Sequence, residues 1–191
     1  PLSVAHPLAA LRYQLLPDHA GGSSIDTNGY FHATEDSQTV RDQVFACLNS
    51  CQADQRIDSV IVQKNKAHTS FHRDHANLYR QMGRPAIQYA FNRSVWRRFE
   101  RIVIVFSSMF EKKRRGILKQ AFKSFVKSQS LVSFAIYFHD NKFDLCSQAV
   151  DYYGWAIYRK WENGDLRSHN LVKDKIRSEF DLFGRGKHLY Y

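Results

Sequence analysis

Residues 144–163 read DLCSQAVDYYGWAIYRKWEN and carry the clearest helical pattern in the chain. Apolar residues recur there at steps of three and four, the period of an α-helix with one side against a core. We expect the core side to comprise Ala149, Val150, Tyr153, Ala156 and Ile157. The polar side would carry Asp144, Gln148, Asp151, Trp155, Tyr158 and Glu162. Because Asp151 lies in the helix interior, it has no capping role, and we interpret it as a buried ion-pair member or a metal ligand.

Helical and strand-like patterns alternate along the rest of the chain. We expect further helices at residues 2–16, 36–51, 76–97 (with a break at Gly83–Pro85), 110–128 and 168–183. Short apolar runs predict strands at residues 57–62, 102–106 and 132–138. Such alternation predicts an α/β fold, with a sheet flanked by helices in one domain over residues 1–191.

The charge balance is strongly basic. The chain has 191 residues, of which 28 are Lys or Arg and 18 are Asp or Glu, so its formal net charge is +10. This excess favours a polyanionic partner, with nucleic acid as the first candidate. The alternative is that the charge serves only to keep the domain soluble. The apolar stretches are too short to cross a bilayer, and the three cysteines form no CxxC pair. We therefore expect a cytoplasmic protein with no membrane partner and with cysteines that are not in disulfides.

The helix expected at 110–128 carries a cationic stripe. Arg115, Lys119, Lys123 and Lys127 follow one another at steps of four residues, and Lys112, Lys113 and Arg114 precede them. A surface of this kind suits contact with a phosphate backbone, and these seven residues are the candidate nucleic-acid-binding set. The alternative is an ordinary solvated helix face.

A second cluster surrounds the turn at 138–144, where an expected strand ends and a helix begins. His139, Asp140 and Asp144 lie in this turn, and sites in α/β sheets gather at such strand ends. Together with Asp151 they are the candidate catalytic residues, and carboxylates of this kind suit Mg²⁺ or Mn²⁺. For Asp144, a helix N-cap is the favoured alternative.

Two further groups have metal-ligand chemistry. Glu35 and Asp36 follow His32 at an expected helix entrance, with Asp36 as the expected N-cap, and Glu35 is a candidate ligand beside Asp144 and Asp151. The histidines His68, His72 and His75 have spacings of four and three, but a polar loop is the favoured interpretation.

The Gln148–Glu162 block resembles the family known as domain of unknown function 3800. Weaker support comes from Tyr30–Ala33 with Glu35 and Asp36, from the strand at 58–63, and from residues 178–181. The resemblance implies an RNase-H-like fold and a metal-dependent nuclease or a nucleic-acid role, in phage defence or a mobile element. Asp151 is the one acidic residue of this chain that matches an acid of the family pattern.

The chain departs from this family in three places. It lacks the opening strand with Asp-Glu-Ser-Gly and the N-terminal β-hairpins, it has Ser107 and Ser108 where many members have an acid, and it has Gln63 where Glu is expected. We expect a fragment, a protein completed by a partner, or a degenerate relative that binds without cutting. The leading hypothesis is an Mg²⁺- or Mn²⁺-dependent nuclease or nuclease component, in which His139 transfers a proton or contacts phosphate. The alternative is a non-catalytic nucleic-acid-binding or assembly subunit, with a protein partner or a homo-oligomer.

Overall fold

A computed structural model describes residues 3–16, 29–52, 54–67, 75–91, 99–108, 112–129, 132–185 and 189, with the backbone alone at 75, 76, 89, 90 and 112–114. Helices predominate, and the described strands form two pairs, β1 with β4 and β2 with β3. This confirms the expected α/β class. The chain clusters into two compact units, one made of Pro1–Ile57 and His139–Ile176 and the other of Asp58–Phe138 and Arg177–Tyr191.

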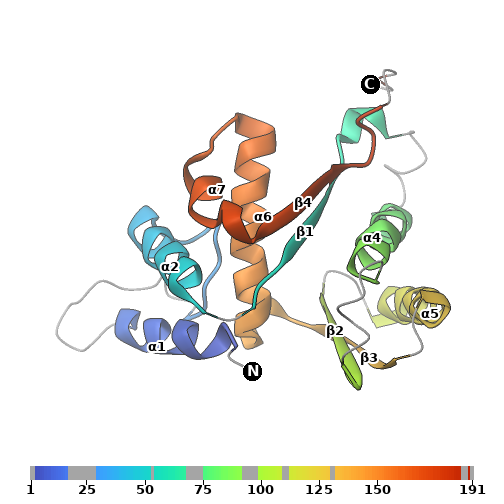
Figure 1. The fold of residues 1–191 in the computed structure, drawn as a ribbon, viewed down its shortest axis with the longest axis horizontal. Helices are drawn as coiled ribbons and strands as arrows, with labels where there is room; N and C mark the ends of the chain where they lie inside the picture. Colours follow the sequence, from blue (N-terminus) through green and yellow to red (C-terminus); the bar gives the residue numbers. More distant parts are fainter. Residues whose placement is uncertain are drawn as a thin grey trace. The chain divides into compact units, whose positions relative to one another are not determined.

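Unit 1 is a helical cluster around one long helix. Its elements are α1 (Ala5–Leu15), α2 (Gln38–Ser50), the 3₁₀ turn η3 (Asn141–Phe143), α6 (Leu145–Asn163), α7 (Arg167–Val172) and the 3₁₀ turn η4 (Lys173–Lys175). Helices α1 and α7 pack on α6, and α2 packs on both α1 and α7 (Figure 1). Tyr152 of α6 is fully buried at the centre of this core, with the ring of Phe45 5.3 Å away and that of Phe31 at 6.4 Å.

Helix α6 begins and ends as its sequence predicts. The Asp144 carboxylate accepts a hydrogen bond from the Cys146 amide and so caps the N-terminus, as expected. Gly164 adopts φ 67°, and its amide donates to the Arg159 and Lys160 carbonyls at the other end.

The buried side of α6 differs from the expected one at three positions, one of which is the fully buried Tyr152, which we had assigned to neither side. Gln148 is 1% exposed although we expected it on the polar side, and Val150 is 67% exposed although we expected it in the core. The buried residues fall at steps of three and four that include Tyr152, and Val150 lies off this stripe: they are Gln148, Ala149, Tyr152, Tyr153, Ala156 and Ile157. We had placed Val150 in the core because it is apolar, but its position in the helical period puts its side chain on the exposed side of α6.

Unit 2 combines helices and strands. Its elements are β1 (Ile57–Ile61), the 3₁₀ turn η1 (Lys64–Lys66), α4 (His75–Phe91), β2 (Arg101–Ser107), α5 (Lys112–Gln129), β3 (Ser133–His139) and β4 (Ile176–Asp181), with Ile57, His139 and Ile176 assigned to unit 1. Helix α4 packs on α5. The core lies around Phe122, whose ring stacks on Phe106 of β2 at 4.7 Å, and Phe106 in turn stacks on Phe138 of β3 at 5.4 Å.

Helix α4 continues through the break that we expected at Gly83–Pro85, so that expectation is wrong. Pro85 removes a backbone hydrogen bond, but the apolar face of α4, with Tyr79, Ile87 and Phe91 in the core of unit 2, offsets this loss. Gly83 allows a close approach to α5, because a Cβ at this position would lie 2.5 Å from the Phe122 ring. Residues 92–97 of the expected helix lie outside the described residues.

The expected C-terminal helix at 168–183 is also wrong beyond Val172. The segment becomes η4 and then strand β4, which pairs with β1. Ser178 donates to Asp58 near the start of both strands, and the Leu182 amide donates to the Ile61 carbonyl at their ends, so the strands run in the same direction. Lys175 donates to the Leu48 and Cys51 carbonyls at the end of α2. The apolar residues of 171–183 fit a helical period, but pairing with β1 outweighs that local signal.

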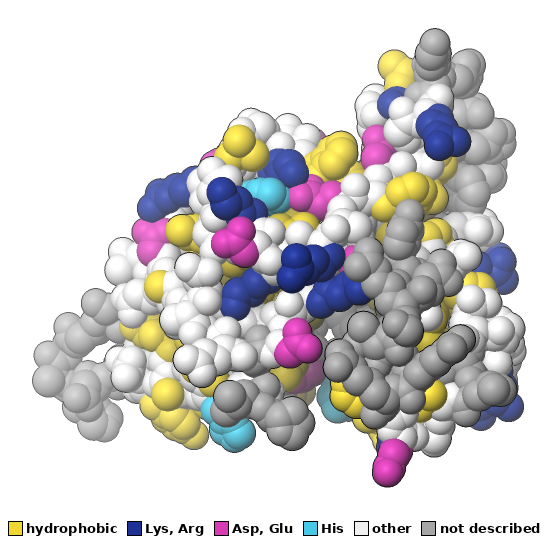
Figure 2. Space-filling model, viewed as in Figure 1, with side chains coloured by type: hydrophobic (Ala, Val, Ile, Leu, Met, Phe, Trp, Pro, Cys, Tyr) yellow, Lys and Arg dark blue, Asp and Glu magenta, His cyan; other side chains and the backbone are white. Residues whose placement is uncertain are grey.

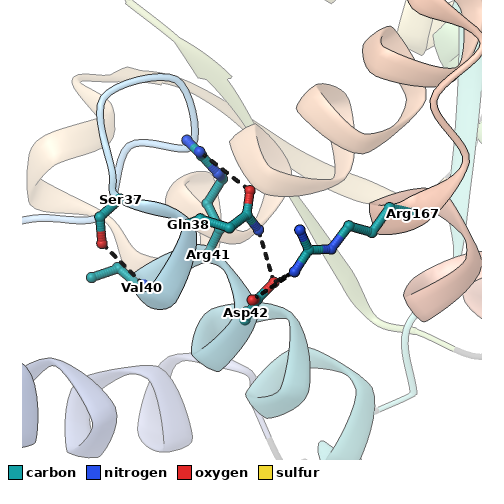
Figure 3. Close-up of polar contacts among 6 residues, drawn as sticks. All are labelled: Ser37, Gln38, Val40, Arg41, Asp42 and Arg167. Carbon is teal, nitrogen blue, oxygen red and sulfur yellow. Dashed lines mark hydrogen bonds and ion pairs between the residues drawn. The ribbon is translucent and has the colours of Figure 1, made fainter.

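A polar network joins the start of α2 to α7 (Figure 3). Ser37, and not Asp36, is the N-cap of α2, since its hydroxyl accepts from the Val40 amide at 3.3 Å. Arg167 donates to the Asp42 carboxylate at 2.8 Å, and Gln38 donates to the same group at 2.8 Å. Both members of this ion pair are about half exposed, so the pair orients α7 and contributes little stability.

Cys47, Cys51 and Cys146 are free, in agreement with the sequence. Cys146 is exposed, and the other two are half-buried, with Cys47 packed against the core of unit 1. None of the described helices has the length and apolar composition needed to cross a membrane.

Gly83→Ala tests the close approach of α4 to α5. Phe122 is 0% exposed and stacked on Phe106, so its ring cannot move away from the added methyl group. Gly116→Ala is the matched control, because Gly116 is also helical and its Cβ would meet nothing within 4 Å. Both changes gain helix propensity, so we expect Gly83→Ala to be less stable than the control by about 1–3 kcal/mol in urea denaturation. Equal stabilities would contradict this packing.

Candidate functional site

Residues 31–36 lie on α6, and this contact contains two buried polar side chains, Asp36 and Gln148. The Phe31 amide donates to the Gln148 side-chain oxygen at 3.2 Å, and the Ala33 amide donates to Asp151 Oδ2 at 3.0 Å. Phe31 and Ala33 are buried, so their amides need partners inside the protein. Gln148 and Asp151 lie three residues apart, about one turn of helix, and together they hold two alternate amides of this segment.

Asp36 lies at the end of this segment, and its side chain makes two hydrogen bonds that hold the segment in place. Its Oδ2 accepts from the His32 amide at 2.8 Å and, through a short hydrogen bond, from the Tyr152 hydroxyl. Asp36 is 3% exposed, and burial raises the pKa of its carboxyl group, although the two hydrogen bonds oppose that rise. Burial and the hydrogen bond to Asp36 raise the pKa of Tyr152 in turn. The Tyr152 hydroxyl therefore stays protonated and serves as a donor.

Arg41 stabilises the other side of the segment. Its Nη1 donates to the carbonyls of Ala33 and Asp36, and its guanidinium lies 5.0 Å from the centre of the Trp155 ring. Arg159 approaches the same ring at 5.7 Å. Two guanidinium groups around one indole are a cation–π arrangement that fixes Trp155 at the edge of the core.

The acids of the turn before α6 are engaged in local structure. Asp144 accepts from the Cys146 amide at 3.0 Å and from the Ser147 hydroxyl at 2.7 Å. Asp140 caps η3 by accepting from the Lys142 amide at 3.3 Å, and it also pairs with the Lys142 ammonium at 3.6 Å. Asp144 thus has the capping role that we weighed against a catalytic one, and Asp140, for which we weighed no such role, is a cap as well.

The structure does not bring the proposed metal ligands into one group. Asp144 and Asp151 are seven residues apart on α6, an axial rise of about 10 Å. His139 and Glu35 are exposed. Within the part of the chain that the structure describes, no three His, Cys, Asp or Glu side chains form a group that could hold a metal ion. His68 and His72 lie outside the described residues.

The cationic stripe lies on α5, within unit 2. Lys119, Lys123 and Lys127 are exposed, whereas Arg115 is half-buried and donates to the Ser108 hydroxyl at 3.0 Å. Lys112, Lys113 and Arg114 fall in the first turn of α5, and their side chains lie outside the described residues. On the face drawn in Figure 2, Lys and Arg side chains stand among Asp and Glu over the described surface.

Sequence reasoning missed the roles of Gln148, Tyr152 and Asp36. We assigned Gln148 to the polar side and Asp36 to a helix cap, and we gave no role to Tyr152. A signal was present in Ser37, a strong N-cap residue directly before α2, which leaves Asp36 outside the helix. The partner of Asp36 is 116 residues away in the sequence, and no local pattern indicates it.

Comparison of the chain with protein-family models, with curated proteins and with solved structures gave no match.

Replacement of Asp151 tests its role as an acceptor for the Ala33 amide. Asp151→Ala leaves this buried amide without its partner, and we expect a loss of about 1–3 kcal/mol in the free energy of unfolding. Asp151→Asn keeps an oxygen acceptor and should lose clearly less. Urea denaturation of both variants measures the difference, and an equal loss in both would show that the negative charge, and not the acceptor, is what matters.

Asp36→Asn tests the buried carboxyl group. Because the pKa is raised in the folded state, folding favours the protonated form, and stability falls as pH rises from the unfolded value of 3.8 through the folded pKa. The variant cannot ionise, so its free energy of unfolding should fall less than that of the wild type between about pH 4 and pH 7. The measurement is urea denaturation across this pH range. Identical slopes would exclude a raised pKa at Asp36.

Proposed function

We propose that the chain binds nucleic acid through its phosphate backbone, with the exposed lysines of α5 as the contact surface. The observation that carries the proposal is the composition of α5, whose 18 residues include seven basic and no acidic side chains. Counterion release from a phosphate backbone favours binding to such a surface.

The geometry of the helix supports this role. Lys119, Lys123 and Lys127 are exposed, and among the described residues none of them has an ion-pair or hydrogen-bond partner. Their spacing gives an axial span of about 12 Å, the rise of three to four phosphates along one strand of a duplex. The opposite side of α5 is fixed to the core of unit 2 by Leu118, Phe122 and Val126, so the lysines project from a rigid element.

We further propose that the chain is a binding or assembly subunit of RNase-H-like type, related to the family that the Gln148–Glu162 block resembles. Asp151 then has a structural role, because it holds the Ala33 amide beside the Asp36–Tyr152 pair. The engagement of Asp140 and Asp144 in caps supports the same choice.

A metal-dependent nuclease is the second candidate. One observation favours it: the hydrogen bond from Ala33 uses Asp151 Oδ2, and Oδ1 has no hydrogen-bond partner among the described residues. The acids near Asp151 do not gather into a metal-binding group in the described chain, so we derive no catalytic step for this candidate.

Charge reversal on α5 tests the binding proposal. The triple variant Lys119→Glu, Lys123→Glu, Lys127→Glu should bind an oligonucleotide at least tenfold more weakly at low salt, because it loses attraction to the phosphates. It should also lower the slope of log affinity against log salt by about 2–3. Fluorescence anisotropy with single-stranded and duplex DNA and RNA gives both quantities.

The matched control is Lys64→Glu, Lys173→Glu, Arg185→Glu, in which three exposed cations outside α5 are reversed. Both triple variants have the same net charge, so a difference between them reports position and not overall charge. If the control loses as much affinity as the α5 variant, binding is non-local and the proposal fails.

A nuclease assay with Mg²⁺ or Mn²⁺ separates the two candidates. We expect no cleavage by the wild type under conditions where it binds. Cleavage that is lost in both Asp151→Asn and Asp151→Ala, with folding intact in Asp151→Asn, would establish the nuclease instead. That variant keeps the acceptor for Ala33 and removes the ionised group that a metal needs.

A further inference from the structure

A pocket of unit 2 lies where α4, α5 and the end of β4 meet. Its volume is about 390 Å³, at the small end of the range of about 300–1,000 Å³ that ligand pockets span. We call it the Arg84 pocket, and it is lined by Gln81, Arg84, Pro85 and Gln88 of α4, by Phe125 of α5 and by two residues that follow β4. Its size suits a ligand with one ring system and a short polar group, and not a length of polymer.

The α4 wall of the pocket follows one stripe of the helix. Gln81, Arg84, Pro85 and Gln88 are spaced by three, one and three residues, so they fall within a sector of about 100° around the axis. The residues with which α4 packs in the core of unit 2 lie outside this sector: Tyr79, Ile87 and Phe91. The pocket stripe is therefore not used for packing, and Gln81, Arg84 and Gln88 are exposed.

Three polar side chains at this pocket have no partner in the described part of the chain. Arg84, Gln81 and Gln88 make neither a hydrogen bond nor an ion pair there. An unpaired guanidinium group binds an anion, and phosphate in particular, through two parallel N–H donors. A glutamine amide presents a donor and an acceptor side by side, the pattern that pairs with the edge of a nucleobase.

Pro85 frees a backbone acceptor at the same wall. In an α-helix the carbonyl of residue 81 accepts from the amide of residue 85, and proline has no amide hydrogen. Helix α4 nevertheless continues through Pro85. Because Gln81 and Pro85 both line the pocket, the Gln81 carbonyl, without its helical donor, lies at the pocket wall. A free carbonyl oxygen favours a ligand that carries an amino group.

The opposite walls are apolar and are fixed by the fold. Phe125 of α5 packs against the core of unit 2, and Leu182 and Phe183 complete the lining. The Leu182 amide donates to the Ile61 carbonyl at 2.9 Å, and the Phe183 amide donates to the Asp181 carboxylate at 3.0 Å. These bonds hold the turn after β4 in place. Phenylalanine rings are the surfaces on which a nucleobase stacks.

We propose that the Arg84 pocket binds a nucleoside monophosphate whose base carries an amino group, with AMP as the probe. The base lies against Phe125 and Phe183, its amino group donates to the Gln81 carbonyl, and Arg84 binds the phosphate. A simple aromatic acid would use Arg84 and the two rings but would leave the glutamine amides and the carbonyl without partners. Inorganic phosphate would leave the apolar walls uncovered. A nucleotide matches all three kinds of group.

The proposal goes beyond the binding of a phosphate backbone by α5 and is independent of it. Phe125 lies about 160° around α5 from Lys123 and from Lys127, so the pocket and the lysines are on opposite sides of this helix. Either can therefore fail alone. The nucleotide can be free or can be the end of a strand, since both carry the same base and phosphate.

Calorimetric titration of the full chain with AMP, adenosine and inorganic phosphate tests the site. AMP should bind with saturation, and adenosine and phosphate should each bind roughly tenfold more weakly or worse, because each makes only part of the contacts. Arg84→Met, an exposed substitution that keeps an apolar stem, should weaken AMP by roughly tenfold or more.

The matched control is Arg177→Met, which removes the same charge from an exposed arginine of β4 and should leave AMP binding unchanged. Circular dichroism of both variants checks that they are folded. A wild-type chain without saturable AMP binding in the millimolar range, or equal losses in the two variants, overturns the proposal.

Pro85→Ala tests the backbone acceptor. The alanine supplies an amide that pairs with the Gln81 carbonyl, and it raises helix propensity, so the variant should stay folded. The wild type should prefer AMP to IMP, which has a carbonyl in place of the amino group, by about two- to tenfold, the effect of one hydrogen bond. Pro85→Ala should lose this preference. A wild type with no preference, or a variant that keeps it, would overturn the recognition of the amino group.

Competition separates a free nucleotide from a strand end. Displacement of AMP by a short oligonucleotide with a terminal phosphate, but not by the same strand without it, would assign the pocket to strand ends. AMP binding that neither strand displaces would assign it to the free nucleotide, and both results support the site. Equal displacement by the two strands would mean that AMP binds to a general phosphate-binding surface, and the pocket would then be excluded.

Discussion

The hydrogen bond between the buried Asp36 carboxyl group and Tyr152 is the interaction on which unit 1 depends. Tyr152 has no exposed surface, so its hydroxyl must find an acceptor inside the core, and Asp36 is that acceptor. The bond sets where residues 31–36 lie on α6, and Gln148 and Asp151 then fit the Phe31 and Ala33 amides. Loss of one member would leave buried polar groups without partners and lower the free energy of unfolding, so the members of this cluster are energetically coupled.

The same cluster shapes the functional interpretation. The Asp151 carboxylate accepts a hydrogen bond from a buried amide, and Asp140 and Asp144 cap a turn and a helix. All three acids therefore have structural roles. The lysines of α5, which lie in the other unit, are among the exposed charges that a partner can reach. Under the proposed function, structure and recognition are separated in the chain: polar groups inside unit 1 organise its core, and the exposed lysines of α5, in unit 2, provide the surface for a polyanion.

Local signals in the sequence predicted most of the elements. Asp144 and Gly164 mark the ends of α6, and runs of β-branched and aromatic residues mark β2 and β3. The failures share one cause, which is a tertiary interaction that outweighs a local preference. Residues 176–181 carry a helical period but pair with β1, and Pro85 stays within α4 because of its packing. For the candidate site, Asp151 could be singled out as an interior acid, but its bond to Ala33 joins residues 118 apart and leaves no local trace.

Unit 1 is assembled from two separate stretches, Pro1–Ile57 and His139–Ile176, and this has a consequence for the order of synthesis. When α2 leaves the ribosome, the helix that buries its apolar face is not yet made. A further 116 residues must be synthesised after Asp36 before its hydrogen-bond partner Tyr152 exists. Contacts of such large sequence separation form slowly, so α1 and α2 cannot complete their packing until α6 emerges. In unit 2 the elements from β1 to β3 follow one another in sequence, so they can begin to pack before α6 is made.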